Sequence, residues 1–155
     1  SLTSISIPPS VTEIGDGAFD GCSSLTSIIV SRENKVYDSR EDCNAIIHSD
    51  SNTLICGCKN TIIPPSVTEI GEGAFFGCSS LTSISIPPSV TEIGHSAFFG
   101  CSNLASISIP SSVTEIGHSA FSGCSNLTSI SIPKGCEVEE NTFRDCPKNI
   151  VITRY

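Results

Sequence analysis

Apolar and small polar residues alternate along a unit that recurs every 23 residues over most of the chain. In one such unit, residues 81–86 read Leu-Thr-Ser-Ile-Ser-Ile, an alternation that predicts a half-buried β-strand. Pro87 and Pro88 end this strand because proline cannot donate to a β-ladder. Residues 90–93 predict a second short extended segment, with valine and isoleucine pointing inward and threonine and glutamate pointing outward.

The second half of each unit is predicted to turn back toward the next strand. Gly94 allows a positive φ, and Ala97 and Phe98 are predicted to lie on one helical turn that places the phenylalanine in the core. Gly100 closes that turn, and Cys101 points inward. Such a unit cannot bury its apolar edge alone, so its stability depends on stacking against neighbouring units.

The length of the repeat indicates the type of solenoid, since a period of 23 lies within the ~20–29 residues of leucine-rich repeats. Two positions that keep this period are held by Leu81, Leu104 and Leu127 and by Cys78, Cys101 and Cys124. We therefore predict an α/β leucine-rich-repeat solenoid dominated by β-structure. It should have a curved parallel β-sheet, coils of ~23 residues, short helical turns and one enlarged repeat with an inserted β-hairpin.

A single domain is predicted to span residues 1–155. Its parts are regular repeats at 1–31, an irregular unit at 32–59, regular repeats at 60–133 and a C-terminal capping repeat at 134–155. The chain opens in mid-pattern, so its first coil is expected to expose an edge that favours end-to-end self-association.

The irregular unit is predicted to carry a hairpin that protrudes from the scaffold. Its two apolar runs, 45–47 and 53–55, flank a polar turn. Pairing of His48 with Thr53 would place Cys43 opposite Cys58. That arrangement is compatible with two alternatives, a disulfide or two reduced thiols. A zinc site is disfavoured because Cys56-Gly57-Cys58 lacks the usual two-residue spacer.

The repeat also carries a resemblance to a known family. The string Ile-Pro-x-Ser-Val-Thr-Glu-Ile-Gly-x-x-Ala-Phe-x-Gly-Cys-Ser-x-Leu resembles the BspA-like leucine-rich repeats of bacterial and protist surface proteins, over essentially the whole chain. The resemblance implies an extracellular or cell-surface protein. It also implies protein ligands, with host extracellular-matrix proteins among the candidates. It implies no catalytic residue and no particular ligand.

Charge and motifs exclude several function classes. The net charge of −8 argues against nucleic acid, which requires a basic stripe. No apolar run reaches the ~18–20 residues of a membrane span, so we expect no membrane insertion. No convergent acid, base and nucleophile and no phosphate-binding loop is evident, so we predict no enzyme, no catalytic residue and no cofactor. A pocket holding Cys43, His48 and an acid would revive an enzymatic hypothesis.

No metal site is predicted either. An acidic ladder recurs at one position of the unit, at Glu13, Glu69, Glu92 and Glu115, but Ca²⁺ prefers a cage of roughly six to eight oxygens to a row of carboxylates. His95 and His118 align at a position that is acidic in other units, so we interpret them as surface histidines.

Three regions are candidates for binding a protein. The first is a ladder of outward serines, which is either a docking surface or a solvated β-surface and includes Ser83, Ser85, Ser106 and Ser108. Next come Phe76 and Phe99, which follow the core phenylalanines and form either an apolar patch or a lateral contact between coils. The last is the irregular unit, whose Tyr37, Arg40 and mixed charges make it the first candidate for specificity.

Two functions are consistent with these features. One is a protein-binding or adhesive module, and the other is a structural spacer that displays another domain of a larger surface protein. A binding patch should be chemically uneven, whereas a spacer should look the same on every coil. The regular units match the spacer hypothesis and the irregular unit does not.

Overall fold

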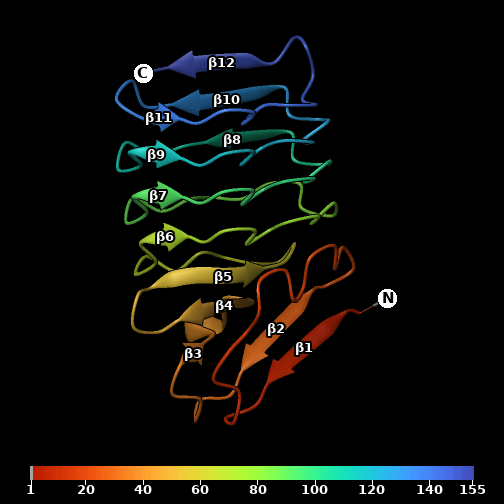
Figure 1. Cartoon of the computed structure of the whole chain (residues 1–155), viewed down its shortest axis with the longest axis vertical. Helices are drawn as coiled ribbons and strands as arrows, with labels where there is room; N and C mark the ends of the chain where they lie inside the picture. The colour runs from red at the N-terminus through yellow and green to blue at the C-terminus, as the bar shows by residue number, and fades with distance from the viewer. Residues whose placement is uncertain (1) are drawn as a thin grey trace.

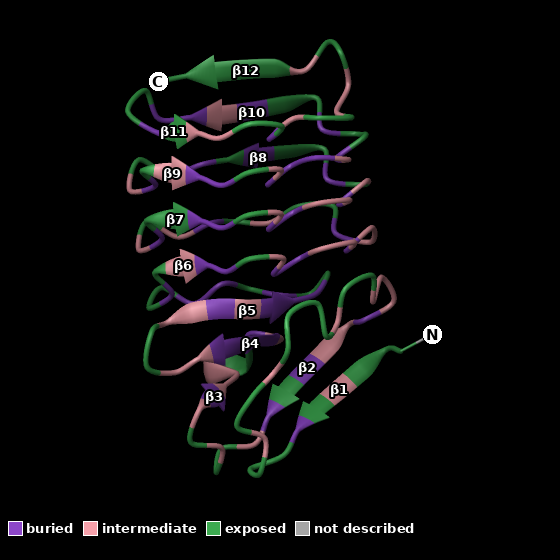
Figure 2. Cartoon of the chain, viewed as in Figure 1, coloured by how far each residue is buried: buried purple, intermediate pink, exposed green. Residues whose placement is uncertain are grey.

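The repeated units stack as the coils of a solenoid in the computed structural model, which describes residues 2–155 (Figure 1). The predicted leucine-rich-repeat architecture is confirmed. The coils carry two kinds of strand, one from the Leu-Thr-Ser-Ile-Ser-Ile segments and one from the Thr-Glu-Ile segments. The interior between them is buried in the middle of the stack and more open at its two ends, where strand β12 (Val151–Arg154) is exposed (Figure 2).

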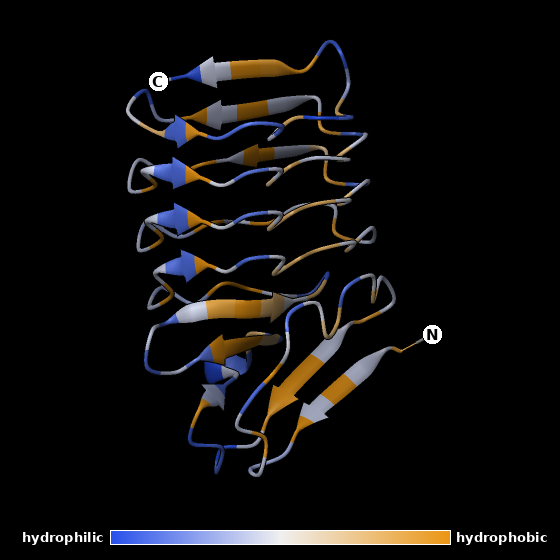
Figure 3. Cartoon of the chain, in the orientation of Figure 1, coloured by the Kyte–Doolittle hydropathy of each residue, from blue (hydrophilic) through white to orange (hydrophobic). Residues whose placement is uncertain are grey.

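The longest sheet has seven strands, in the order β11-β9-β7-β6-β5-β4-β3. Strands β5, β6, β7, β9 and β11 pair in parallel and place Glu69, Glu92 and Glu115 side by side. Strands β6, β7, β9 and β11 each begin with a hydrophilic glutamate and end with a hydrophobic residue, which in β6, β7 and β9 is a buried isoleucine (Figure 3). The bounds are β3 Tyr37–Asp38, β4 Ala45–His48, β5 Thr53–Gly57, β6 Glu69–Ile70, β7 Glu92–Ile93, β9 Glu115–Ile116 and β11 Glu137–Val138.

The serine-bearing segments form two smaller parallel sheets, at opposite ends of the stack. One pairs β1 (Ser4–Ile7) with β2 (Ser27–Val30), and the other pairs β8 (Ser106–Ser108), β10 (Ser129–Ile132) and β12 (Val151–Arg154). Residues 81–86 lie between them and form no strand. In the preceding coil, Thr61 stands where the regular unit has Ile84, and its hydroxyl donates to the carbonyl oxygen of Asn44 at 2.6 Å. That coil is therefore bonded to the hairpin rather than to residues 81–86.

The predicted core is confirmed. Phe75, Phe98, Phe121 and Phe143 stack in a column with successive ring centroids 5.0, 5.2 and 6.1 Å apart. The inward cysteines lie beside this column, and the thiol of Cys101 donates to the carbonyl of Phe75 at 3.2 Å. The thiol of Cys124 makes the same contact with Phe98 one coil later. All nine cysteines are free.

The expected helical turns are tight turns with bonds from residue i to residue i−3, such as Ala97 to Gly94 and Phe99 to Ser96. They do not become α-helix because alternate amides bond to the adjoining coil. The amide of Phe75 donates to Ala97, and the amide of Gly77 donates to Phe99, each at 2.7 Å. The only helix in residues 2–155 is the 3-10 turn η1, Arg40–Asp42.

The hairpin of the irregular unit is β4 and β5, with His48 opposite Thr53 as predicted. A shift of register at Ile46 and Ile47 leaves Ile55 as an extra residue, so Ala45 lies opposite Gly57. Cys58 therefore lies beside Asn44 and not beside Cys43. The thiol of Cys58 donates a hydrogen bond to the carbonyl oxygen of Asn44 at 3.5 Å. The prediction that Cys43 lies opposite Cys58, which would allow a disulfide, is therefore wrong.

The expectation that the hairpin protrudes is also wrong. Strand β5 pairs with β6, and the side chains of Ala45, Ile46, Ile47 and Leu54 are completely buried. The hairpin is hydrophobic on both faces, so it is incorporated into the long sheet and joins the regular coils to the N-terminal pair, β1 and β2.

Candidate functional site

The serine face is exposed, as predicted. Ser83, Ser85, Ser106 and Ser108 all face solvent, and the hydroxyl of Ser131 donates to Ser108 across adjacent coils at 3.1 Å. The surface of the regular units is thus small, polar and uniform.

Two isoleucines interrupt this face next to the irregular unit. Ile29 pairs with Ser6 in the β1–β2 register, and Ile62 precedes Ser85 by one repeat, so both occupy outward serine positions. Their exposed fractions are 57% and 77%, among the largest of the apolar side chains. Neither was among the predicted binding residues, although alignment of residues 25–30 and 58–63 with the repeat shows isoleucine at two outward positions.

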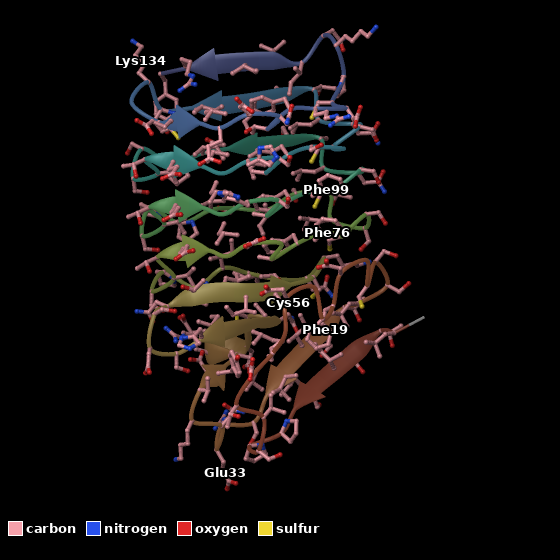
Figure 4. The ribbon with its side chains drawn as sticks, in the orientation of Figure 1. Phe19, Glu33, Cys56, Phe76, Phe99 and Lys134 are labelled. Carbon is pink, nitrogen blue, oxygen red and sulfur yellow. The ribbon has the colours of Figure 1, made fainter. Side chains whose placement is uncertain are left out.

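Phe76 and Phe99 lie on the turn side of the coils, one above the other (Figure 4). Their rings stack with centroids 4.7 Å apart and an interplanar angle of 6°. Both remain half-buried, because they pack laterally and also keep an exposed edge. The two sequence hypotheses for this pair are therefore compatible.

The side chains of Tyr37 and Arg40 mainly make hydrogen bonds within the chain. Tyr37 is buried, and its hydroxyl accepts a bond from the amide of Ile14 at 3.1 Å. Arg40 makes a bidentate ion pair with Asp38, at 2.7 Å from Nε and 2.6 Å from Nη2. Its Nη1 donates to Asn52 at 2.7 Å, so Arg40 ties the hairpin turn to the loop before it. Burial acts to raise the pKa of Asp38, but hydrogen bonds from Arg40 and Ser49 outweigh it and lower the pKa overall.

Cys43 and His48 do not come together in a pocket. Cys43 is buried in the core, and burial raises the pKa of its thiol to about 11. His48 packs edge-on against Tyr37 with ring centroids 5.8 Å apart. Over residues 2–155, no group of three or more His, Cys, Asp or Glu side chains is arranged to hold a metal ion.

The irregular unit has a second irregularity, a missing turn. Leu54 pairs with Ile70, so this coil advances 16 residues where regular coils advance 23, as from Ile70 to Ile93. The amide of Gly57 donates to Ala74 at 2.9 Å, just as that of Phe75 donates to Ala97. Gly57 thus takes the phenylalanine position, and the Gly-x-x-Ala-Phe-x-Gly-Cys turn is absent from this coil.

A cavity of about 210 Å³ opens where that turn is missing. It lies between the turn of the first coil (residues 15–22) and that of the first coil after the hairpin (residues 71–78). The two turns touch at one end, where the amide of Gly21 donates to Phe76 at 3.0 Å. They diverge at the other end. There the amide of Ile14 donates to the hydroxyl of Tyr37 instead of to the backbone of a neighbouring coil. We call this cavity the notch.

Aromatic and acidic residues together line the notch. Its aromatic residues are Phe19, Tyr37, Phe75 and Phe76, and its acidic residues are Asp16, Asp20, Glu69 and Glu72. No lysine, arginine or histidine lines it. Burial raises the pKa of Asp20, and burial together with the nearby Glu92 raises that of Glu69. Burial also raises the pKa of the Cys56 thiol to about 12, so this thiol is neutral at pH 7.

The repeat geometry can be compared with known families. The model of the BspA type leucine rich repeat region matches six copies, over residues 1–43 and 46–154. The chain belongs to the BspA-type leucine-rich-repeat family. Among curated protein sequences, none matches it.

Solved structures of bacterial leucine-rich-repeat proteins share the fold of this BspA-type chain. A leucine-rich repeat protein from Eubacterium ventriosum is 29% identical with a TM-score of 0.77, covering 97% of this chain and 48% of its own. A leucine rich cell surface protein from Faecalibacterium prausnitzii is 28% identical with a TM-score of 0.75, covering 99% and 48%. The chain thus spans about half the length of each neighbour. Between residues 2 and 155, no helix has the length and apolar character needed to cross a bilayer.

Proposed function

We propose that this BspA-type chain is a protein-binding module of a secreted or surface-displayed protein, and that its partner binds at the irregular unit. The observation that supports this most is the chemical unevenness of the surface beside that unit, where Ile29 and Ile62 flank residues 32–59. The regular coils present the same serines in the same positions, whereas Ile29 and Ile62 expose apolar side chains at the equivalent positions beside the hairpin.

Apolar side chains on a polar surface are the usual anchors of a protein interface. Burying each isoleucine against a partner would contribute about 1.5–3 kcal/mol at most, before the cost of association. The surrounding serines are small enough to let a partner approach the backbone closely. A family of leucine-rich repeats, with a neighbour described as a cell surface protein, is in keeping with this role. Extracellular-matrix proteins of a host are the first partners to test.

The test is surface plasmon resonance with immobilised fibronectin, fibrinogen, collagen and mucin. The parent chain is compared with an Ile29→Ser, Ile62→Ser variant, which restores the repeat pattern. A control variant adds Ser85→Ile and Ser108→Ile to that background, so that the composition is unchanged and the isoleucines lie on regular coils. We expect saturable binding by the parent and at least a tenfold loss in both variants, since two anchors are displaced.

Equal binding by the relocated control would indicate general adhesion of apolar surface and would contradict the proposal. Absence of binding by all three proteins would favour the alternative function, a structural spacer that displays another domain. The uniform serine face of the regular coils is the observation that favours that alternative.

A further inference from the structure

The notch holds four carboxylates without a cationic neighbour. In residues 2–155 the ion pairs are Arg40–Asp38, His95–Glu139 and Arg144–Asp145, and none involves the acids of the notch. The turns that carry them belong to segments without lysine or arginine, since neither 1–31 nor 60–133 contains either residue. The acidic charge in this cavity is therefore uncompensated within the described part of the chain.

The carboxylate of Asp20 lies against Gly17 of its own turn, where a built β-carbon would be 2.8 Å from Oδ2, and it also approaches the opposite wall. A β-carbon built on Gly73 would lie 3.9 Å from Oδ1 of Asp20, so the acid of the first turn approaches the backbone of the second. Asp20 occupies the repeat position that Phe76 and Phe99 hold in the regular coils. At the one place where two turns diverge, an outward aromatic residue is thus replaced by an acid that lines the opening.

We propose that the notch binds a single basic side chain, lysine or arginine, of a protein partner. The proposal rests on the proposed function in that the side chain belongs to a bound protein. The ammonium or guanidinium group would lie at the acidic opening beside Asp20, and its aliphatic stem would pack on Phe19 and Ile55. Aromatic faces add to the attraction, because they stabilise a cation held within about 6 Å.

Size and chemistry distinguish this ligand from the alternatives. A volume of about 210 Å³ is below the roughly 300–1,000 Å³ of sites for drug-sized ligands, and it suits one long side chain. A metal ion is a poorer match, because no three potential ligands among the described residues are arranged around a common point. A purely apolar ligand would leave the carboxylates to be desolvated without compensation.

The experiment is an NMR titration of the uniformly ¹⁵N-labelled chain with three probes. They are the N-acetyl methylamides of lysine, arginine and norleucine, the last being close to lysine in shape without its charge. We expect saturable shifts of the amides of residues 15–22 and 71–78 with lysine or arginine at millimolar concentration. Norleucine should bind at least about tenfold more weakly.

Two matched variants separate the notch from general electrostatics. Asp20→Asn with Glu72→Gln should weaken binding about tenfold, whereas Glu33→Gln with Glu140→Gln changes the net charge equally and should leave it unchanged. Equal binding of norleucine, equal weakening by both double variants, or no saturable shift would each overturn the proposal.

The two proposals fail separately. If the chain binds a matrix protein but no basic probe, the notch proposal is wrong and the proposed function stands. If the probes bind in the notch but no protein binds to the chain, the pocket is established without its partner. Retained peak dispersion in every variant shows that the fold is intact in each comparison.

Discussion

Gly57 is the residue on which the missing turn depends, and its replacement by alanine tests this directly. A β-carbon at this position would lie 2.2 Å from Cε1 and 2.5 Å from Cζ of Phe75. The Phe75 ring cannot easily retreat, because it stacks on Phe98 with centroids 5.0 Å apart and is 1% exposed. The substitution therefore forces a shift in the phenylalanine column.

The expected magnitude follows from two opposing effects. Overpacking a well-packed core costs about 1–3 kcal/mol. Replacing glycine by alanine lowers the entropy of the unfolded chain and stabilises by about 0.4–1 kcal/mol when the backbone conformation permits it. Gly57 does not have a positive φ, so no backbone strain is added. We expect Gly57→Ala to destabilise the chain by about 1–2 kcal/mol.

Urea unfolding followed by circular dichroism measures this change. The matched control is Gly135→Ala, because an added β-carbon there meets nothing within 4 Å and the φ is not positive. It should be neutral or slightly stabilising. The double variant Gly57→Ala, Phe75→Leu should lose less stability than the sum of the losses of the two single variants, because the smaller side chain relieves the overlap. If Gly57→Ala were as harmless as Gly135→Ala, Gly57 could not lie against Phe75 and the shortened coil would be refuted.

Three further predictions concern the repeated positions. Cys101→Ala should cost about 1–3 kcal/mol in urea unfolding, because it leaves a gap and removes the thiol bond to the Phe75 carbonyl; a neutral result would contradict that bond. Glu92→Gln should stabilise the chain by about 0.2–1 kcal/mol at pH 7 by relieving repulsion in the glutamate row. Burial and the charge of Glu92 raise the pKa of Glu69, so the repulsion between them is lost as the pH falls through that raised pKa, and the gain should vanish at acidic pH in the same assay. The lowered pKa of Asp38 has the opposite sign, since its stabilising contribution is present above the unfolded-state pKa and lost as the pH falls through the folded-state value. Asp38→Asn should therefore be less stable than the parent at pH 7 and equal to it near pH 2, as thermal melts at the two pH values would show.

The features that recur in every repeat could be predicted from the sequence. Phe98, Cys101 and Leu104 recur at fixed spacing, and their burial follows because each coil must cover the next. The hairpin pairing of His48 with Thr53 was also predictable, since two apolar runs flank one polar turn.

The notch could not be predicted from spacing. An insertion and the loss of a turn occur in the same unit, so the distance from Leu25 to Leu81 shows only the net gain of ten residues. The burial of Tyr37 was equally hidden, because its partner, the Ile14 amide, is free only where the regular coil contact is lost. The bulge at Ile55, which separates Cys43 from Cys58, has no signature in the alternation of β4 and β5.

The most direct test of the irregular unit as the binding site is to replace it. Residues 32–59 can be exchanged for a copy of residues 9–26, with Ile29→Ser and Ile62→Ser in the flanking segments, which continues the repeat without interruption and removes both proposed anchors. Binding of this variant and the parent chain to the same matrix proteins is then compared by surface plasmon resonance. The proposal predicts saturable binding by the parent and none by the regularised chain; equal binding by both would contradict it.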